Sequence, residues 1–259
     1  MPERGARDAL AHLVITWLLQ FGKKQKNDVY CSDVSGTFDK VNSSRLLRKL
    51  QAKGVPEEIL AVLKSWLAAR KARVAVGSKL SADMHISNMV YQGTVLGPPL
   101  WNIFYEDAAV AIHIHDFCEI VFADDLNAYK TFALATPNET LKTDMKKCQL
   151  ELHKWGRANQ VSFDASKESM HVLAVQGGEG ANFRLLGVPF DNALSMRDAV
   201  IELVGECTWK MASILRTARF FTDGELVNVY KSQLLSYVEY RASAIYNACD
   251  SILASHDKF

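Results

Sequence analysis

Three aspartates lie at the ends of stretches that have the composition of buried β-strands. Asp33 follows the apolar run Val29–Cys31, and Asp124 and Asp125 form a tight turn between two further runs of β-favouring residues. Carboxylate oxygens are preferred ligands of Mg²⁺, and phosphoryl transfer commonly uses two such ions about 3.5–4 Å apart. We therefore interpret Asp33, Asp124 and Asp125 as candidate ligands for a pair of Mg²⁺ ions.

Each of these acids, taken alone, has an ordinary explanation. An Asp-Asp dipeptide is expected about once in a chain of this length, and acids are common in turns, where they bond to the local backbone. The apolar residues directly beside the acids favour the metal interpretation, because burying paired carboxylates without a cation is costly.

The segment between the acids, Gln92–Trp101, is rich in glycine and proline. Gly93 and Gly97 permit a close approach of the backbone to a ligand, and Gln92 can form hydrogen bonds with a base, a sugar or the backbone. Taken alone, such a segment is more often a plain loop.

Charge is unevenly distributed along the chain, although the formal net charge is only +1. Residues 1–80 carry a net charge of +8, residues 81–140 carry −7, and residues 141–259 are neutral. A basic segment can neutralise phosphates, and an acidic segment can hold hard cations. The pattern therefore suits an enzyme that handles a polyanion at a metal site, although a solvated charged face would look the same.

Hydrophobic periodicity and turn residues predict the elements that would position these side chains. We expect helices at about 6–22, 43–53, 56–67, 100–112, 138–159, 197–221 and 225–248, and strands at about 28–33, 73–76, 84–90, 117–123, 126–132, 170–175 and 182–186. Two pairs of strands would flank glycine-containing turns, one at Gly77-Ser78 and one at 177–180. This order predicts an α+β fold with a mainly antiparallel sheet covered by helices on one side.

Five segments, in this order, resemble the polymerase core of reverse transcriptases, most closely the non-LTR (LINE-type) retrotransposon kind. They are the first catalytic motif at Asp33–Asp39, the Gln-Gly-x-x-x-x-Pro segment at Gln92–Pro98, the aromatic-Ala-Asp-Asp hairpin at Phe122–Asp125, the following lysine at Lys167, and the Leu-Gly primer-grip strand at Leu186–Val188. Pro2–Asp8 looks like the last piece of the finger region, so the resemblance runs from about residue 2 to about residue 190.

The resemblance implies a polymerase palm with partial fingers over residues 1–190 and a helical, thumb-like segment over residues 191–259. Asp33 and Asp124 would be the main ligands of two Mg²⁺ ions, for which Mn²⁺ is the alternative. Asp125 would assist, and the Val34 carbonyl would add an oxygen. All three aspartates would thus be catalytic.

The resemblance also implies roles for four substrate-binding residues. Phe38 would lie under the sugar of the incoming nucleotide and exclude a 2′-hydroxyl, and Gln92 and Gly93 would shape the nucleotide and template pocket. Lys167 would protonate or neutralise the leaving pyrophosphate. The ordinary alternatives are a core phenylalanine for Phe38 and a surface lysine for Lys167.

The sequence departs from the family pattern at several positions. Thr37 stands where the family usually has Ala, Trp101 where it has Phe, and Asp164 and Glu168 add acids beside Lys167. The finger strands would lie upstream of Met1, and the sequence shows no endonuclease, RNase H or zinc-knuckle segment. We therefore interpret it as part of a truncated element.

Other classes of protein are disfavoured by the sequence. The longest apolar run, near Ala9–Phe21, is shorter than the roughly 20 residues of a membrane span, so no membrane partner is expected. Five scattered cysteines without a C-x-x-C pair favour a reducing, intracellular location, either nuclear or cytoplasmic. His113–Asp116 could be a metal cluster, but a polar helix end is the commoner meaning.

The function predicted from the sequence is RNA-directed DNA polymerisation, in which a primer 3′-hydroxyl attacks the α-phosphate of a dNTP. Its partners would be an RNA template, a DNA primer and dNTPs, and the sequence indicates no protein partner. One alternative is a catalytically inactive remnant that at most binds nucleic acid. Another is an RNA-templated RNA polymerase, against which the bulky Phe38 argues.

Overall fold

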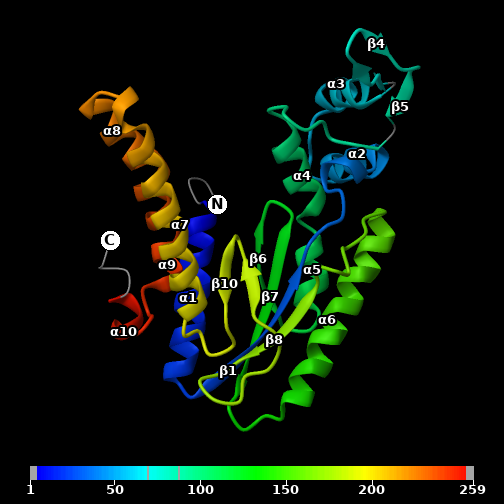
Figure 1. Cartoon of the computed structure of the whole chain (residues 1–259). Coiled ribbons are helices and arrows are strands. Elements are labelled where there is room, and N and C mark those ends of the chain that lie inside the picture. Colours follow the sequence, from blue (N-terminus) through cyan, green and yellow to red (C-terminus); the bar gives the residue numbers. More distant parts are fainter. Residues whose placement is uncertain (1–4, 69, 87, 255–259) are drawn as a thin grey trace. The chain divides into compact units, whose positions relative to one another are not determined.

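The computed structural model describes residues 5–68, 70–86 and 88–254 (Figure 1). The chain forms two compact units. The first, named the site unit here, consists of Tyr30–Ala128 and Asp144–Glu168; the second, the terminal unit, consists of the residues up to Val29, Tyr129–Thr143 and the residues from Ser169 on. The division at residue 190 expected from the sequence stays a prediction.

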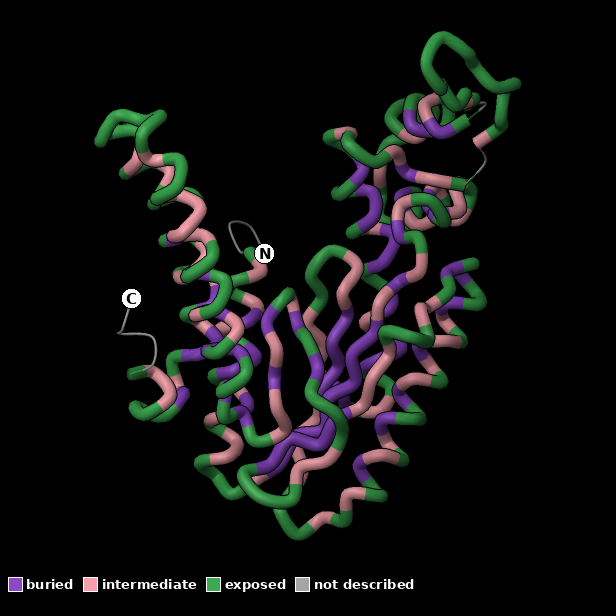
Figure 2. The backbone as a smooth tube through the Cα atoms, in the orientation of Figure 1, coloured by how far each residue is buried: buried purple, intermediate pink, exposed green. Residues whose placement is uncertain are grey.

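The largest sheet has four strands in the order β6-β7-β1-β8. They are β1 (Gln25–Ser32), β6 (Cys118–Phe122), β7 (Asp125–Ala133) and β8 (Ser169–Leu173). All of β1 after Gln25 is buried (Figure 2), as expected of a central strand. It begins three residues earlier than predicted, because its polar residues have hydrogen-bond partners: Lys26 Nζ donates to Asn138 Oδ1 at 2.6 Å, and Asp28 Oδ1 accepts from the Lys130 amide at 2.9 Å.

Helices of the site unit surround a core rich in aromatic rings. They are α2 (Ser43–Ala52), α3 (Glu57–Leu67), α4 (Gly97–Tyr105), α5 (Ala108–His113) and the part of α6 (Asn138–Asn159) from Asp144 on. Trp101, Phe104 and Tyr105 of α4 are buried. The prediction of a single helix over 100–112 is wrong. The helix is interrupted at Asp107, whose carboxylate accepts hydrogen bonds from Lys49 Nζ at 2.7 Å and Trp155 Nε1 at 2.8 Å.

Two short strand pairs lie between α3 and α4, and their pairing differs from the prediction. β2 (Arg70–Ala72) pairs with β5 (Met84–Ile86), and β3 (Ala75–Val76) pairs with β4 (Lys79–Leu80), both antiparallel. The prediction of a two-residue turn at Gly77-Ser78 is confirmed. A turn this short places Val76 opposite Lys79 and so sets the register of the strand pair. Met84–Ile86 therefore pairs with Arg70–Ala72 and not with 73–76, and the predicted strand over 84–90 includes residue 87, which lies outside the described residues.

Long helices and one hairpin make up most of the terminal unit. They are α1 (Ala6–Gly22), β9 (Phe183–Leu185), β10 (Val188–Phe190), α7 (Arg197–Thr217), α8 (Asp223–Tyr230), α9 (Ser236–Ile245) and α10 (Asp250–Leu253). Helix α9 packs against α1 and α7 (Figure 1). A 3₁₀ turn at Ala218–Phe220 ends the first predicted terminal helix early, and a π-helical turn at Lys231–Leu235 interrupts the second.

The hairpin of the terminal unit forms at a turn that was not predicted. β9 pairs with β10 across Leu186-Gly187, where both residues have positive φ, 47° and 79°, the pattern of a type I′ hairpin turn. The segment around 170–175 instead joins the large sheet as β8.

Helices together with antiparallel strand pairs make the α+β class correct. In the part of the chain that the structure describes, every helix is too short or too polar to span a bilayer.

Candidate active site

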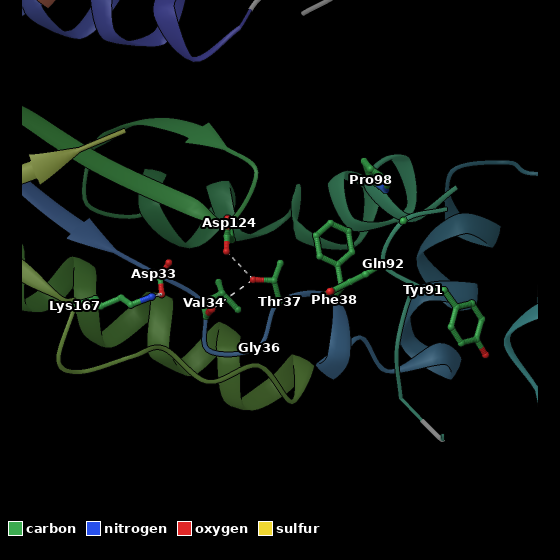
Figure 3. Close-up of a pocket in the computed structure, with 11 residues that line it drawn as sticks. Asp33, Val34, Gly36, Thr37, Phe38, Tyr91, Gln92, Pro98, Asp124 and Lys167 are labelled. Atoms are coloured by element: carbon green, nitrogen blue, oxygen red, sulfur yellow. Dashed lines mark hydrogen bonds and ion pairs between the residues drawn. The ribbon is translucent and has the colours of Figure 1, made fainter. Parts of the chain in front are cut away.

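A pocket of about 560 Å³ lies in the site unit. It is lined by Asp33, Val34, Gly36, Thr37, Phe38, Tyr91, Gln92, Gly93, Pro98, Asp124 and Lys167 (Figure 3). Every site residue predicted from the sequence is therefore at this pocket, except Asp125. Four segments that are far apart in the sequence supply the lining, so the fold brings four of the five predicted motifs together. The fifth, Leu186–Val188, belongs to the terminal unit.

Asp33 and Val34 enter the pocket directly after β1. The Asp33 carbonyl accepts a hydrogen bond from the Asp164 amide at 3.0 Å, and the Ser35 amide donates to the Ser162 carbonyl at 2.9 Å. These bonds hold the chain straight for two residues beyond the strand. Gly36 then takes φ +70°, a conformation that only glycine adopts without strain, and the chain turns so that Thr37 and Phe38 also line the pocket.

Asp124 lies in the turn between β6 and β7, and α4 holds that turn. Ala123 has the left-handed φ of +55°, which is costly for a residue with a Cβ. The indole Nε1 of Trp101 donates a 2.8 Å hydrogen bond to the Ala123 carbonyl. The family usually has Phe at the position of Trp101. A phenylalanine has no N–H group in its side chain and could not make this bond.

Asp125 is displaced from the pocket because the turn lies one residue earlier than predicted. Asp125 is already the first residue of β7, and neighbouring side chains of a strand point to opposite faces. Burial raises the pKa of the half-buried Asp125, and the nearby charges of Asp124 and Asp33 raise it further. Asp125 thus adds negative charge beside the pocket without lining it.

The glycine-rich loop is tied to Phe38 and folded on itself. The Val90 amide donates to the Phe38 carbonyl at 2.9 Å, and Thr94 Oγ1 both donates to the Tyr91 carbonyl at 2.6 Å and accepts from the Gly97 amide at 3.1 Å. A Cβ at Gly97 would lie 2.9 Å from the Tyr91 carbonyl oxygen, so only glycine fits this position. Gln92 and Gly93 are consequently presented at the pocket by a rigid loop.

Sequence reasoning missed Tyr91, which also lines the pocket. Its ring packs edge-on against Trp66 with centroids 4.8 Å apart, and the Arg70 guanidinium lies 5.0 Å from its ring centre. The only signal in the sequence was an aromatic residue directly before Gln92. The Tyr91 ring is thereby held by an indole and a guanidinium beside the loop.

Lys167 supplies the cation of the pocket. Its Nζ forms a 2.7 Å ion pair with Asp33 Oδ2, and hydrogen bonding and attraction to Asp33 raise the pKa of Lys167. The Lys167 side chain is 60% exposed, whereas that of Asp33 is 17% exposed. A lysine this accessible can leave Asp33 for another anion at little cost, because water solvates its exposed ammonium group.

The acids beside Lys167 do not line the pocket. Asp164 accepts hydrogen bonds from the Ser166 amide at 3.0 Å and from Ser166 Oγ at 2.6 Å. Glu168 is largely buried and accepts hydrogen bonds from Tyr30, from Gln149 at 3.1 Å and from His153 at 2.6 Å. Both acids therefore fix the segment that carries Lys167 and lie outside the pocket lining.

Negative charge accumulates around Asp124. Burial raises the pKa of the Tyr105 hydroxyl, and the charges of Asp124, Asp33 and Asp125 raise it further. Among the described residues, no three His, Cys, Asp or Glu side chains form a ready-made metal cluster. Mg²⁺ is, however, commonly held by one or two carboxylates together with substrate phosphates. Asp33 and Asp124, which both line the pocket, fit such a site.

The other candidate cluster, His113–Asp116, is the polar end of a helix. Helix α5 ends at His113, and the His113 ring pairs with Glu119 of β6. This pairing agrees with the commoner meaning of such a cluster in the sequence.

Comparison with known proteins identifies the family. The model of the reverse transcriptase (RNA-dependent DNA polymerase) family matches residues 10–190. The RNA-directed DNA polymerase from mobile element jockey of Drosophila funebris is 24% identical over 208 residues, which cover 74% of this chain and 23% of that protein. The Retrovirus-related Pol polyprotein from type-1 retrotransposable element R2 of Popillia japonica is 25% identical over 131 residues, which cover 47% of this chain and 22% of that protein.

The chain thus spans less than a quarter of the length of these two relatives. The family match extends over most of the described chain and contains all the motifs that line the pocket. The resemblance seen in the sequence is therefore confirmed: the chain belongs to the reverse transcriptase family.

Proposed function

We propose that this chain is an RNA-directed DNA polymerase that extends a DNA primer on an RNA template with dNTPs inside the cell. Residues 1–190 would be its palm with partial fingers, and residues 191–259 a thumb-like segment. The observation that carries the proposal is that Asp33 and Asp124 line one pocket with Phe38, Gln92 and Lys167, in a chain of the reverse transcriptase family.

In this proposal the carboxylates of the pocket hold two Mg²⁺ ions, or Mn²⁺ in their place. Asp33 and Asp124 are the principal ligands, the Val34 carbonyl adds an oxygen, and Asp125 assists from its place beside the pocket. When bound, such ions activate the attacking hydroxyl and stabilise the leaving oxygen of an in-line displacement.

The chain's own side chains bind and orient the substrates. Gln92 and Gly93, on their rigid loop, shape the nucleotide and template pocket, and the Phe38 ring excludes a 2′-hydroxyl. Lys167 neutralises or protonates the leaving pyrophosphate after exchanging Asp33 for phosphate, which its exposure permits. The primer 3′-oxygen forms a bond to the α-phosphorus, and the bond from that phosphorus to pyrophosphate breaks.

Primer extension on poly(rA)/oligo(dT) with dTTP and Mg²⁺ tests the proposal. The unmodified chain is expected to incorporate dTTP, and Asp124→Ala to lower incorporation at least about 10³-fold, because removal of a principal metal ligand removes the stabilisation of the transition state. Asp144→Asn is the matched control, since Asp144 pairs with Lys147 on α6, away from the pocket.

Two results would contradict the polymerase proposal. The first is incorporation that survives Asp124→Ala at the level of the Asp144→Asn control. The second is salt-dependent binding of poly(rA) with no incorporation by the unmodified chain, which would instead identify a nucleic-acid-binding remnant.

A further inference from the structure

Thr37 stands at a position where the resemblance leads one to expect alanine, and its hydroxyl reaches two groups of the candidate metal site. Thr37 is 7% exposed. Its Oγ1 lies 2.9 Å from Asp124 Oδ2 and 3.4 Å from the Val34 carbonyl oxygen (Figure 3). The hydroxyl therefore lies between two groups that the proposed function treats as ligands.

The two contacts are not equivalent. A threonine hydroxyl has one hydrogen to donate, and a bond to a carboxylate is stronger than one to a neutral carbonyl. The shorter distance also belongs to the carboxylate. The hydrogen therefore goes to Asp124 Oδ2, which leaves Oδ1 of that carboxylate outside this bond and fixes the direction in which it faces.

Thr37 can act as a fixed support because it is itself held in place. Its side chain is β-branched and stiff at χ1. The backbone before it turns at Gly36 with φ +70°, and the Phe38 carbonyl after it is bonded to the Val90 amide at 2.9 Å. The Asp124 carboxylate is thereby oriented before any cation arrives, on a turn whose other side Trp101 holds.

We propose that Thr37 is a positioning residue of the metal site, whose hydroxyl orients the Asp124 carboxylate for a divalent cation. The inference rests on the proposed function only in taking Asp124 as a ligand. Groups that orient a metal ligand through a hydrogen bond typically contribute 10- to 100-fold to metal affinity or activity. The hydroxyl, rather than the bulk of the side chain, is the feature that matters.

Cation binding by the purified full chain tests this directly, without measuring polymerisation. Mn²⁺ binding is followed by isothermal titration calorimetry, and Mg²⁺ binding by the rise in Tm with Mg²⁺ concentration. Thr37→Val, which keeps the shape and removes the hydroxyl, is expected to weaken binding about tenfold. Thr37→Ser, which keeps the hydroxyl, is expected to bind within about twofold of the unmodified chain.

The Asp124→Asn variant distinguishes a failure of the proposed metal site from a failure of the role proposed for Thr37. If Asp124→Asn binds Mn²⁺ as tightly as the unmodified chain, then Asp124 is not a ligand, and the metal site of the proposed function fails. If Asp124→Asn abolishes binding while Thr37→Val leaves it unchanged, the metal site stands and the role of Thr37 is overturned.

The threonine series also separates a hydroxyl effect from a packing effect. Equal loss of binding in Thr37→Ser, which keeps the hydroxyl, and in Thr37→Val, which lacks it, would show that the hydroxyl is not the feature that matters, and would overturn the inference. Thr37→Ala is a second variant without the hydroxyl, smaller than valine, and is used if the valine variant does not fold. It is expected to weaken binding by the same factor as valine.

Discussion

The Phe38 side chain is in contact with helix α4 at one side of the pocket. Its ring centroid lies 6.0 Å from that of Trp101, and a Cβ at Gly97 would already be 3.6 Å from its Cε1. The Phe38 carbonyl is bonded to the Val90 amide at 2.9 Å. A bulky ring at this place can reject a substrate group by clash.

Replacing Phe38 therefore tests nucleotide selection. Phe38→Ala is expected to lower the preference for dTTP over UTP at least about tenfold on poly(rA)/oligo(dT), because the space that would receive a 2′-hydroxyl opens. The quantity measured is the ratio of kcat/KM for the two nucleotides. Phe38→Tyr keeps the bulk and should keep the preference, and an unchanged ratio in Phe38→Ala would reduce Phe38 to a packing residue.

At the scale of elements, helix α4 connects the glycine-rich loop to the Asp124 turn. Gly97 begins the helix against Tyr91, Trp101 lies one turn later and holds Ala123, and Tyr105 is buried one turn further on. Residues four apart share one face of a helix, and the rings of Trp101 and Tyr105 stack with centroids 4.9 Å apart. One face of a single helix thus sets the positions of two parts of the pocket.

A methyl group at the start of α4 should disturb this face. Gly97→Ala would put its Cβ 2.9 Å from a backbone oxygen and 3.3 Å from Thr94 Oγ1, so the loop or the helix must shift, at a cost of about 1–3 kcal/mol. Urea unfolding is expected to show this loss, accompanied by lower incorporation in primer extension.

Gly205→Ala is the control for that experiment, and it is expected to change the free energy of unfolding in the opposite direction. Gly205 lies inside α7, where an added Cβ meets no atom within 4 Å, so alanine is expected to stabilise the helix by about 1 kcal/mol. If both alanine variants change the free energy of unfolding by the same amount, the close approach at Gly97 has no energetic effect.

The sequence predicts helices and local motifs of this chain well and strand partners poorly. The helices expected at 6–22 and 138–159 coincide with α1 and α6, because apolar periodicity is a property of the segment itself. The strand at 170–175 was found, but its pairing in the large sheet depends on β1, far away in the sequence.

The same distinction applies to the candidate site. The motifs indicated the acids, Phe38, Gln92 and Lys167, which all line the pocket apart from Asp125. The exclusion of Asp125 follows from a shift of the turn by one residue, which reverses the faces of a strand. The bond from Thr37 to Asp124 joins two distant loops, and only the folded chain reveals it.

At the scale of the whole molecule, stability depends on a charge cluster in the terminal unit. Glu202 of α7 accepts hydrogen bonds from Arg184 of β9 at 2.7 and 3.0 Å and from the buried Arg241 of α9 at 2.8 Å. These bonds lower the pKa of Glu202 from 4.5 to about 2, and the bonds from Arg184 contribute more to this shift than the bond from Arg241. The cluster joins a strand and two helices through one carboxylate.

This depressed pKa predicts how stability depends on pH. Because the folded pKa lies below the unfolded one, the stabilisation by Glu202 is complete above about pH 4.5 and is lost as the pH falls towards 2. Glu202→Gln should therefore lower the urea midpoint at neutral pH, and the difference from the unmodified chain should shrink at about pH 3. The exposed Glu239→Gln serves as the control, and a difference that does not depend on pH would contradict the assignment.

The two units are interleaved along the chain, so the site unit cannot be obtained by itself as one uninterrupted piece of polypeptide. The first segment of the site unit ends at Ala128, within β7, and its second segment begins at Asp144, within α6. A fragment that carries both Asp33 and Lys167 must also carry Tyr129–Thr143, which belongs to the terminal unit. Transplanting the site unit alone into another protein would accordingly require cuts inside a strand and inside a helix, where hydrogen-bonded ladders are broken.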